Sequence, residues 1–494
     1  MNPLKKLMGE TVIYGFSTIL GRFINWLLVP LYTRVLSPVD NGIFTNLMGY
    51  VALLVVLLTY GTETGFFRFA TKDNKDRVFS TLLASLLFTS TLFLLLCFSF
   101  LPQIVSFLEV GNHPIYFVLL IVTIAIDVVS TLPFALLRME GKALRFGVIK
   151  FVNILINVGL NLFFYLLCPF LEKKGISVPF YQVDGGVVYI FISYLVSSVC
   201  TLVMLFPYIF RFKFVFSFSL LKDILKYSYP ILIVSVAGMI NLQGDKILMP
   251  KILGDGEEAL AITGIYGASY KLALVMYIFT QGFRFAFEPF FFNYAKHNDS
   301  KKIYQDVLLY FTGFGLMIFL GVMYFLDVLK YFLGSEYFSG LTILPWVLMA
   351  NLFQGIYYSL SLWYKLTDKT IYGAYMAIIG CVITIGGNVI FLPKIGFMAF
   401  SAYSVFTCFL VMTILSFILG RHFYKINYDI PKIIFYFAVC LLFYFVGGYI
   451  KFDNNLVTCL ARLPLFVLFV YIFIKKEMSF LLTKDFMYKL IHKK

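Results

Sequence analysis

Long apolar runs alternate along the whole chain with short clusters of charged residues, proline and glycine. A helix needs about 20 mostly apolar residues to cross the hydrocarbon core of a bilayer. Division of the chain at the polar clusters predicts about 14 membrane-spanning helices. The predicted spans cover residues 11–36, 43–67, 78–101, 114–137, 146–168, 187–210, 227–253, 259–285, 303–326, 339–364, 370–393, 396–420, 430–450 and 455–474.

The composition agrees with a polytopic membrane protein. Apolar residues make up 61% of the 494 residues and charged residues only 13%, whereas soluble domains average roughly 45–50% and roughly 25%. A net charge of +15 would suggest nucleic acid binding in a soluble chain, but here most of the 40 lysines and arginines lie in loops. We therefore predict an all-α membrane protein with no nucleic-acid partner.

The basic residues are concentrated in every second loop, beginning with Lys5 and Lys6, while the intervening loops hold few. Basic loops stay on the cytoplasmic side of a membrane, so both termini are predicted to be cytoplasmic. No small-residue cleavage site follows the first apolar run, which is typical of an uncleaved signal anchor.

Two short motifs recur at matching places in the chain. LLVP at residues 27–30 precedes Gly42-Ile43-Phe44, and ILMP at residues 247–250 precedes Gly264-Ile265-Tyr266. Each pair lies between the first two spans of a six-span block, as expected of parallel repeats related by an axis along the membrane normal. The predicted domains are an N-terminal lobe (1–213, spans 1–6), a C-terminal lobe (214–429, spans 7–12), and two extra spans with a basic tail (430–494).

Several cations lie inside predicted spans. Arg22 falls near the middle of the first span, where a charge costs on the order of 2.5–3.5 kcal/mol and normally faces a bundle interior or a wet cavity. The amides of Asn153 and Asn157 extend a polar stripe from Lys150, although such amides also hydrogen-bond between packed helices. Because cations outnumber acids in the spans, we expect an anionic substrate. The candidate substrate-binding residues are Arg22, Arg34, Lys150, Lys246, Lys271, Arg284, Asn153 and Asn157.

Few acidic residues lie in or beside the spans. Glu63, Asp127, Asp245 and Glu288 are candidates for coupling transport to protons or sodium ions, or for simple ion pairs such as Arg284 with Glu288. The seven cysteines are scattered singly, so neither a disulfide framework nor a metal site is expected. We therefore predict no cofactor and no catalytic residue.

Four segments resemble a known family. They are the first span, with Arg22 and Arg34 leading into Ser37-Pro38, and the motifs GTETGFFRFA (61–70), GDKILM (244–249) and IYGASYKL (265–272). The chain resembles the polysaccharide-export branch of the multidrug/oligosaccharidyl-lipid/polysaccharide (MOP) superfamily, the Wzx-type O-antigen flippases. The resemblance implies two six-helix lobes around a central cavity, followed by two extra helices.

The resemblance also implies a function. Such a protein moves an undecaprenyl-diphosphate-linked oligosaccharide across the bacterial inner membrane by alternating access, surrounded by membrane lipid and working beside polysaccharide polymerase and assembly proteins. Relatives that move lipid-linked peptidoglycan precursor use basic residues in the first and eighth spans, and Arg22 and Lys271 occupy those places. We expect Arg22, Lys150 and Lys271 to hold the diphosphate.

Two other functions are open at this stage. The first is a drug or cation antiporter of the same superfamily, but its substrates favour an acidic cavity and the first span has no acid between Glu10 and Asp40. The second is a membrane glycosyltransferase, polymerase or ligase acting on the same lipid. The longest outward loop, residues 169–186, offers only Glu172 and Asp184 and no paired carboxylates for acid–base catalysis.

Overall fold

The structure is a computed structural model that describes residue 15 and residues 19–108, 113–179, 181–182, 185–211, 214–254, 256–294, 300–367, 369–395 and 398–477. Within these residues the chain is helical and no strand occurs. Residues 19–26 are helical, and the first numbered helices are α2 (Val29–Val35), α3 (Pro38–Thr59), α4 (Thr62–Phe69), α5 (Lys75–Ser99), α6 (Leu101–Leu108), α7 (Pro114–Met139), α8 (Ala143–Leu162), α9 (Cys168–Lys173) and α10 (Val188–Ile209).

The second half of the chain continues in the same way. Its α-helices are α11 (Phe218–Leu253), α12 (Glu257–Leu272), α13 (Leu274–Tyr294), α14 (Ser300–Tyr324), α15 (Leu326–Leu329), α16 (Leu344–Leu360), α17 (Leu362–Leu366), α18 (Ile371–Ile395), α19 (Ala399–Phe423), α20 (Ile430–Tyr449) and α21 (Asn455–Glu477). A π-helical turn, η1 (Phe163–Leu167), joins α8 to α9, and two 3₁₀ segments, η2 (Lys330–Phe332) and η3 (Ser335–Ile343), join α15 to α16.

The predicted membrane spans are confirmed from the second to the last. Among the described residues, 12 helices are long and apolar enough to cross a membrane, and the pair α12–α13, bent by 54°, makes a thirteenth. The first predicted span lies partly outside the described residues. Its described part breaks at Leu27-Leu28, just before Pro30, whose missing backbone N–H suits the first turn of α2.

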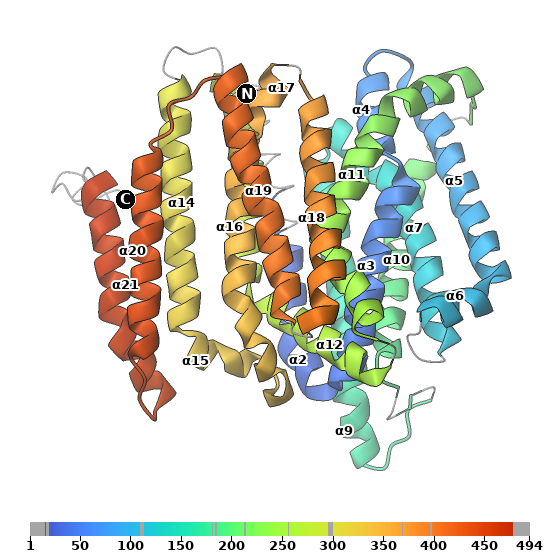
Figure 1. Ribbon diagram of the computed structural model, residues 1–494. Coiled ribbons are helices and arrows are strands. Elements are labelled where there is room, and N and C mark those ends of the chain that lie inside the picture. The colour runs from blue at the N-terminus through green and yellow to red at the C-terminus, as the bar shows by residue number, and fades with distance from the viewer. Residues whose placement is uncertain are drawn as a thin grey trace, which may run out of the picture.

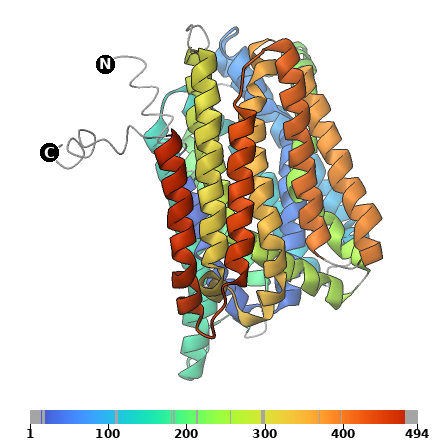
Figure 2. The same ribbon diagram turned by 60° about the vertical axis from the view of Figure 1, so that its left-hand side comes forward.

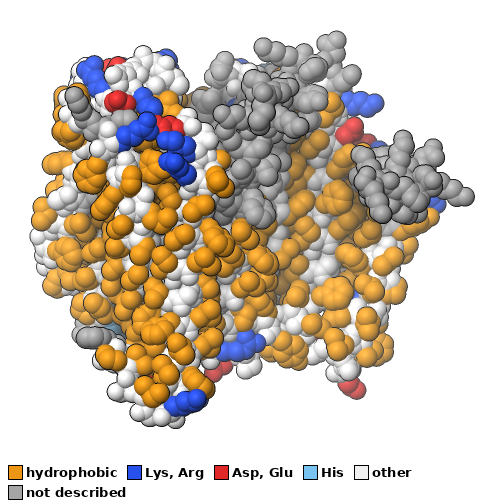
Figure 3. All heavy atoms as spheres, turned by 180° about the vertical axis from the view of Figure 1, so that it is seen from behind, with side chains coloured by type: hydrophobic (Ala, Val, Ile, Leu, Met, Phe, Trp, Pro, Cys, Tyr) orange, Lys and Arg blue, Asp and Glu red, His pale blue; other side chains and the backbone are white. Residues whose placement is uncertain are grey.

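The helices stand roughly parallel in one bundle (Figures 1 and 2). Helices α3 to α10 lie on one side, α14, α20 and α21 lie on the other, and α11, α12, α18 and α19 fill the space between. On the face seen in Figure 3, apolar side chains form a broad band, and Lys, Arg, Asp and Glu side chains lie mainly toward its two ends. An apolar surface of this kind is required where a protein faces the hydrocarbon core of a bilayer. The chain is therefore a multi-pass membrane protein, while the division at residues 213 and 429 stays a prediction.

A close helix crossing joins the two halves of the bundle. Helix α3 packs along α12, and two glycines allow the backbones to touch. A methyl group on Gly42 would lie 1.8 Å from the carbonyl oxygen of Leu260, and one on Gly264 would lie 2.0 Å from that of Pro38. Gly42 and Gly264 occupy equivalent positions in the two sequence motifs, so the two motifs contact each other where α3 crosses α12.

Hydrogen bonds close the same end of the bundle, the end that carries α2, α9 and α12. The Tyr337 hydroxyl donates to the carbonyl oxygen of Leu36 at 3.0 Å and accepts from the Asn41 amide at 3.1 Å. The backbone N–H of Gly334 donates to the Thr33 hydroxyl at 3.1 Å. These contacts join the start of α3 and the end of α2 to η3, so the two halves are in firm contact there.

Glu140 forms ion pairs with three basic residues at the opposite end of the bundle, where α4 lies. Its carboxylate, 11% exposed, binds Lys75 at 2.8 Å, Arg211 at 2.9 Å and Lys142, so it links the ends of α5, α7, α8 and α10. Burial alone would raise the pKa of Glu140, but hydrogen bonds from Lys142 and Lys75 and the charges of these lysines lower it to about 2.

Replacing Glu140 with glutamine is expected to lower the melting temperature of the detergent-purified protein at pH 7. The native pKa lies below the unfolded value of about 4.3, so the carboxylate stabilises the fold fully above pH ~4.3 and loses this effect as the pH falls toward 2. The difference between wild type and Glu140→Gln should therefore shrink between about pH 5 and pH 3. Asp453→Asn is the control, because Asp453 is exposed and forms no ion pair with a described residue. A difference that grows as the pH falls would contradict this account.

Candidate substrate-binding site

The described part of the first span runs antiparallel to α13, across the boundary between the two halves. Ile19 lies beside Gly282, with its Cδ1 atom 3.7 Å from where a Cβ of that glycine would be. Farther along, Arg22 donates a hydrogen bond to the Tyr277 hydroxyl, and its guanidinium lies 4.9 Å from the centre of that ring. Arg22 is exposed, so it faces open space beside α13 rather than a packed core.

Lys271 reaches the same boundary from the second half. It lies near the end of α12, where the chain bends into α13. The indole N–H of Trp26, one helical turn after Arg22, donates to the Lys271 carbonyl oxygen at 2.8 Å. The Lys271 ammonium lies 4.9 Å from the centre of the Phe44 ring and 5.9 Å from that of Tyr32. Arg22 and the backbone of Lys271 thus lie along the same contact between the first span and the second half, with the two charged groups against different rings, and the shared anion site stays a prediction.

Neither cation has an acidic partner among the described residues. This differs from the pairing of cations elsewhere in the bundle: Lys246 binds Asp245 at 3.2 Å, and Arg462 binds Asp327 at 2.8 Å. A cation inside a membrane protein normally pairs or faces water, because an unpaired buried charge is costly. The boundary between the halves therefore carries positive charge that an anion can neutralise.

The other predicted substrate residues lie elsewhere. Lys246 is buried in its ion pair, and Arg34 donates to the carbonyl oxygen of Tyr331 at the α9 end. The Lys150 ammonium lies 4.2 Å from the Phe134 ring centre, within the first half. Arg284 lies on α13 with its guanidinium 4.7 Å from the Tyr358 ring centre.

The two predicted asparagines of the polar stripe on α8 differ in their contacts. Asn153 donates to the carbonyl oxygen of Ser197 at 3.0 Å and to the Thr201 hydroxyl at 2.9 Å, both on α10. Asn157 is buried, and its backbone carbonyl accepts a hydrogen bond from the Asn161 amide. In this conformation Asn153 joins α8 to α10, one of the alternatives that the sequence left open, whereas the Asn157 amide nitrogen has no hydrogen-bond partner among the described residues.

Three of the four candidate coupling acids have polar partners. Glu63 forms an ion pair with Arg138 near the α4 end, and Asp127 accepts a hydrogen bond from Ser198 at 2.7 Å. Asp245 is fully buried beside Lys246 and also accepts from the Tyr266 hydroxyl. The side chain of Glu288, and with it the predicted pair with Arg284, lies outside the described part of the chain.

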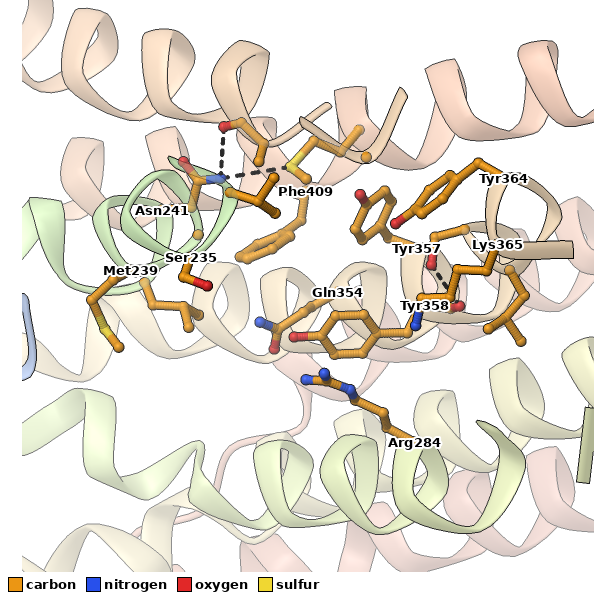
Figure 4. A pocket seen from close by; sticks show the side chains of 18 of the residues that line it. Ser235, Met239, Asn241, Arg284, Gln354, Tyr357, Tyr358, Tyr364, Lys365 and Phe409 are labelled. Carbon is orange, nitrogen blue, oxygen red and sulfur yellow. Dashed lines mark hydrogen bonds between the residues drawn. The ribbon is translucent and has the colours of Figure 1, made fainter. Parts of the chain in front are cut away.

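The sequence did not reveal a cavity of about 440 Å³ in the second half, next to Arg284 (Figure 4). Helices α11, α13, α16, α17, α18 and α19 surround it, and Val56 of α3 closes one side. Aromatic rings and two buried amides, Asn241 and Gln354, line its wall. In sequence, aromatic residues that face a cavity cannot be distinguished from those that face lipid. Only the amides Asn241 and Gln354 could have indicated a polar cavity.

Comparisons with known proteins identify the family. Residues 7–294 match the model of the polysaccharide biosynthesis protein family. The chain belongs to this family. A search of curated proteins finds no significant match.

Solved structures show the same fold. The chain resembles the lipid II flippase MurJ in an inward closed conformation, with 16% identity and a TM-score of 0.73 over 95% of this chain and 100% of that one. It also resembles an inward-facing multidrug resistance MATE transporter of the MOP superfamily, with 18% identity and a TM-score of 0.62 over 81% and 94%. A MOP superfamily transporter from Pyrococcus furiosus, described as having a binding pocket of reversed polarity, matches with 17% identity and a TM-score of 0.55 over 84% and 95%.

These matches confirm the resemblance to the MOP superfamily and the all-α fold predicted from the sequence. This member of the polysaccharide biosynthesis family has the fold of MOP transporters and flippases. The structural likenesses are all below 20% identity, so they establish the fold and leave the substrate to the chemistry of the site.

Proposed function

We propose that the protein is a flippase for an undecaprenyl-diphosphate-linked oligosaccharide, an O-antigen, capsule or exopolysaccharide repeat unit. The observation that supports this proposal is that two cations, Arg22 on the first span and Lys271 on α12, lie where the two halves are in contact, and that neither has an acidic partner among the described residues. Charge-assisted hydrogen bonds from arginine and lysine are the usual way in which proteins hold phosphate groups.

Membership of a polysaccharide biosynthesis family supports a glycan as the group attached to the diphosphate. The first half of the bundle would rock against the second, so that the site opens to one side of the membrane and then to the other. The contacts of α2 and α3 with α12 and η3 close the α9 end in this conformation. Opening must therefore begin at the α4 end or follow the separation of these contacts.

Two other functions fit the residues less well. A cation antiporter shares the fold, but the unpaired cations at the boundary would repel a cationic drug. An enzyme acting on the same lipid would need an acid–base or metal-binding group, whereas the carboxylates of Glu63 and Asp245 are held in ion pairs. Family and fold are those of transporters, and we propose transport without catalysis.

The proposal includes an ion that drives transport and a place in the cell. Protons or sodium ions would act through Glu63, Asp127, Asp245 or Glu288, the protein would lie in the bacterial inner membrane, and both termini would be cytoplasmic. Polysaccharide polymerase or assembly proteins would receive the product. The genetic test is to introduce the chain into cells that lack their own flippase for the matching glycan. Restored surface polysaccharide supports the proposal, and continued accumulation of lipid-linked glycan despite normal protein levels contradicts it.

The orientation has its own test. In a chain whose native cysteines are replaced, Thr71→Cys at the α4 end should resist a membrane-impermeant thiol reagent applied to intact spheroplasts. Ser335→Cys at the α9 end should react, because both positions are exposed and at opposite ends of the bundle. Both should react after the membrane is permeabilised, which controls for local accessibility. The reverse labelling pattern would place the termini outside.

A further inference from the structure

Two residues in the wall of the cavity of about 440 Å³ in the second half have a buried acceptor atom without a partner among the described residues. Gln354 is 1% exposed and Asn241 is 2% exposed, and both line the cavity. The Gln354 Oε1 and Asn241 Oδ1 atoms form no hydrogen bond with any described residue. The Asn241 amide N–H donates to the Ala377 carbonyl oxygen at 3.2 Å, which fixes the orientation of the amide and leaves its oxygen unpaired.

Buried acceptors of this kind require a donor. Leaving one unsatisfied costs about 1–3 kcal/mol, so a ligand that supplies O–H or N–H groups gains from filling the cavity. A diphosphate cannot do so, because its oxygens are acceptors and would oppose the amide oxygens. An ammonium ligand could donate, but the described residues of the wall include Arg284 and Lys365 and no acid that would bind a cation. A neutral donor of several hydroxyl groups fits these constraints.

The remaining wall suits the apolar faces of a sugar ring. Phe283, Phe287, Tyr357, Tyr358 and Phe409 surround the cavity. In Figure 4 the Tyr358 ring lies beside Gln354 and next to the Arg284 guanidinium, which is 4.7 Å from the ring centre. The volume falls within the range of roughly 300–1,000 Å³ that is usual for small-molecule sites, in which apolar walls surround a few polar groups.

We propose that this cavity is a saccharide subsite that binds hydroxyl groups of the glycan through Gln354 and Asn241. The proposal rests on the proposed function and adds to it a second point of contact within the second half of the bundle. The diphosphate would be held at the boundary of the halves while one sugar enters the cavity. Substrate selection would then depend on sugar hydroxyls as well as on the phosphate charge.

The test compares two lipids on the full-length, detergent-purified protein: undecaprenyl diphosphate without sugar, and the undecaprenyl-diphosphate-linked oligosaccharide extracted from the source cells. Wild type should bind the glycan-bearing lipid more tightly. Gln354→Met should weaken this binding roughly three- to tenfold, the loss of one hydrogen bond, and leave the affinity for the sugar-free lipid unchanged. Ser235→Trp, which fills the cavity from an exposed position on its wall, should have the same selective effect.

Asn351→Leu is the matched control. Asn351 is a buried amide one turn from Gln354 on α16, also with an unpaired atom, but it is not part of the cavity wall. Asn351→Leu should leave the affinities for the sugar-free lipid and for the glycan-bearing lipid unchanged. Equal affinity of wild type for the two lipids, or equal weakening of both by Gln354→Met, would overturn the saccharide subsite and leave the flippase proposal intact. Failure of wild type to bind either lipid would overturn both.

Discussion

The double substitution Arg22→Gln, Lys271→Gln is expected to abolish transport of the lipid-linked glycan. Each charge-assisted hydrogen bond to a diphosphate contributes about 1.5–3 kcal/mol, so the loss of one should weaken binding roughly ten- to a hundredfold. Loss of both removes the positive charge that the structure places at the boundary of the halves. The measurement is restoration of surface polysaccharide in a flippase-null strain, with membrane levels of the protein determined in parallel.

Two further variants, together with the expression level of the double variant, separate the effect of charge from an effect on folding. Arg22→Lys should retain part of the activity, since it keeps the charge but loses the paired donors of the guanidinium. Lys174→Gln, at an exposed position near the α9 end, should behave as wild type. Neutral residues also remove an insertion cost, so the double variant should be expressed normally. Full complementation by the double variant would show that Arg22 and Lys271 do not hold the substrate.

Substitution of Gly42 or Gly264 with alanine is expected to have the largest effect on the fold. A Cβ on either residue would lie about 2 Å or less from a backbone carbonyl oxygen, which cannot rotate away. Helices α3 and α12 would have to separate, at a cost of about 1–3 kcal/mol for overpacking. We expect a lower melting temperature in detergent and reduced complementation for each variant.

The double variant and a control sharpen this prediction. The two glycines touch, since a Cβ on Gly264 would lie 2.6 Å from the Gly42 nitrogen. Separation of the helices to accept one methyl group therefore makes room for the other, and the combined effect should be smaller than the sum. Gly159→Ala is the control, because no atom lies within 4 Å of its added Cβ. A Gly42→Ala protein as stable as Gly159→Ala would contradict the close crossing.

Much of the fold could be predicted from the sequence because bilayer thickness fixes the length of an apolar run. The repeat of Gly42 and Gly264 was also visible, since tight helix crossings need small residues. The contact between the two glycines was not, because a repeat in sequence does not say which surfaces meet. The bend between α12 and α13 was not predicted. Residues 259–285 contain no proline that would indicate a break in the helix, so one continuous span was expected.

The site was predicted only in part. A cation in the middle of a span gives a strong signal because its cost must be offset. Arg22 and Lys271 both lie where the first span contacts α12 and α13, but their charged groups lie against different rings, so a shared anion site stays a prediction. Amide side chains give a weaker signal. Asn and Gln occur both in hydrogen bonds between packed helices and in the walls of polar cavities, so the residue type alone does not distinguish the two. Asn153 on α8 bonds to α10, whereas Gln354 on α16 has an unpaired oxygen at a cavity. Only the tertiary structure distinguishes the two cases.

The most direct measurement is transport by the purified protein in sealed vesicles. Undecaprenyl-diphosphate-linked glycan from the source cells is placed in both leaflets, and a membrane-impermeant enzyme that removes or labels the sugar is added outside. The account predicts that wild type exposes the inner-leaflet glycan to the enzyme, while the Arg22→Gln, Lys271→Gln protein leaves about half of the glycan protected. Equal protection in vesicles with wild type and in vesicles without protein would contradict the central claim that this chain is a flippase.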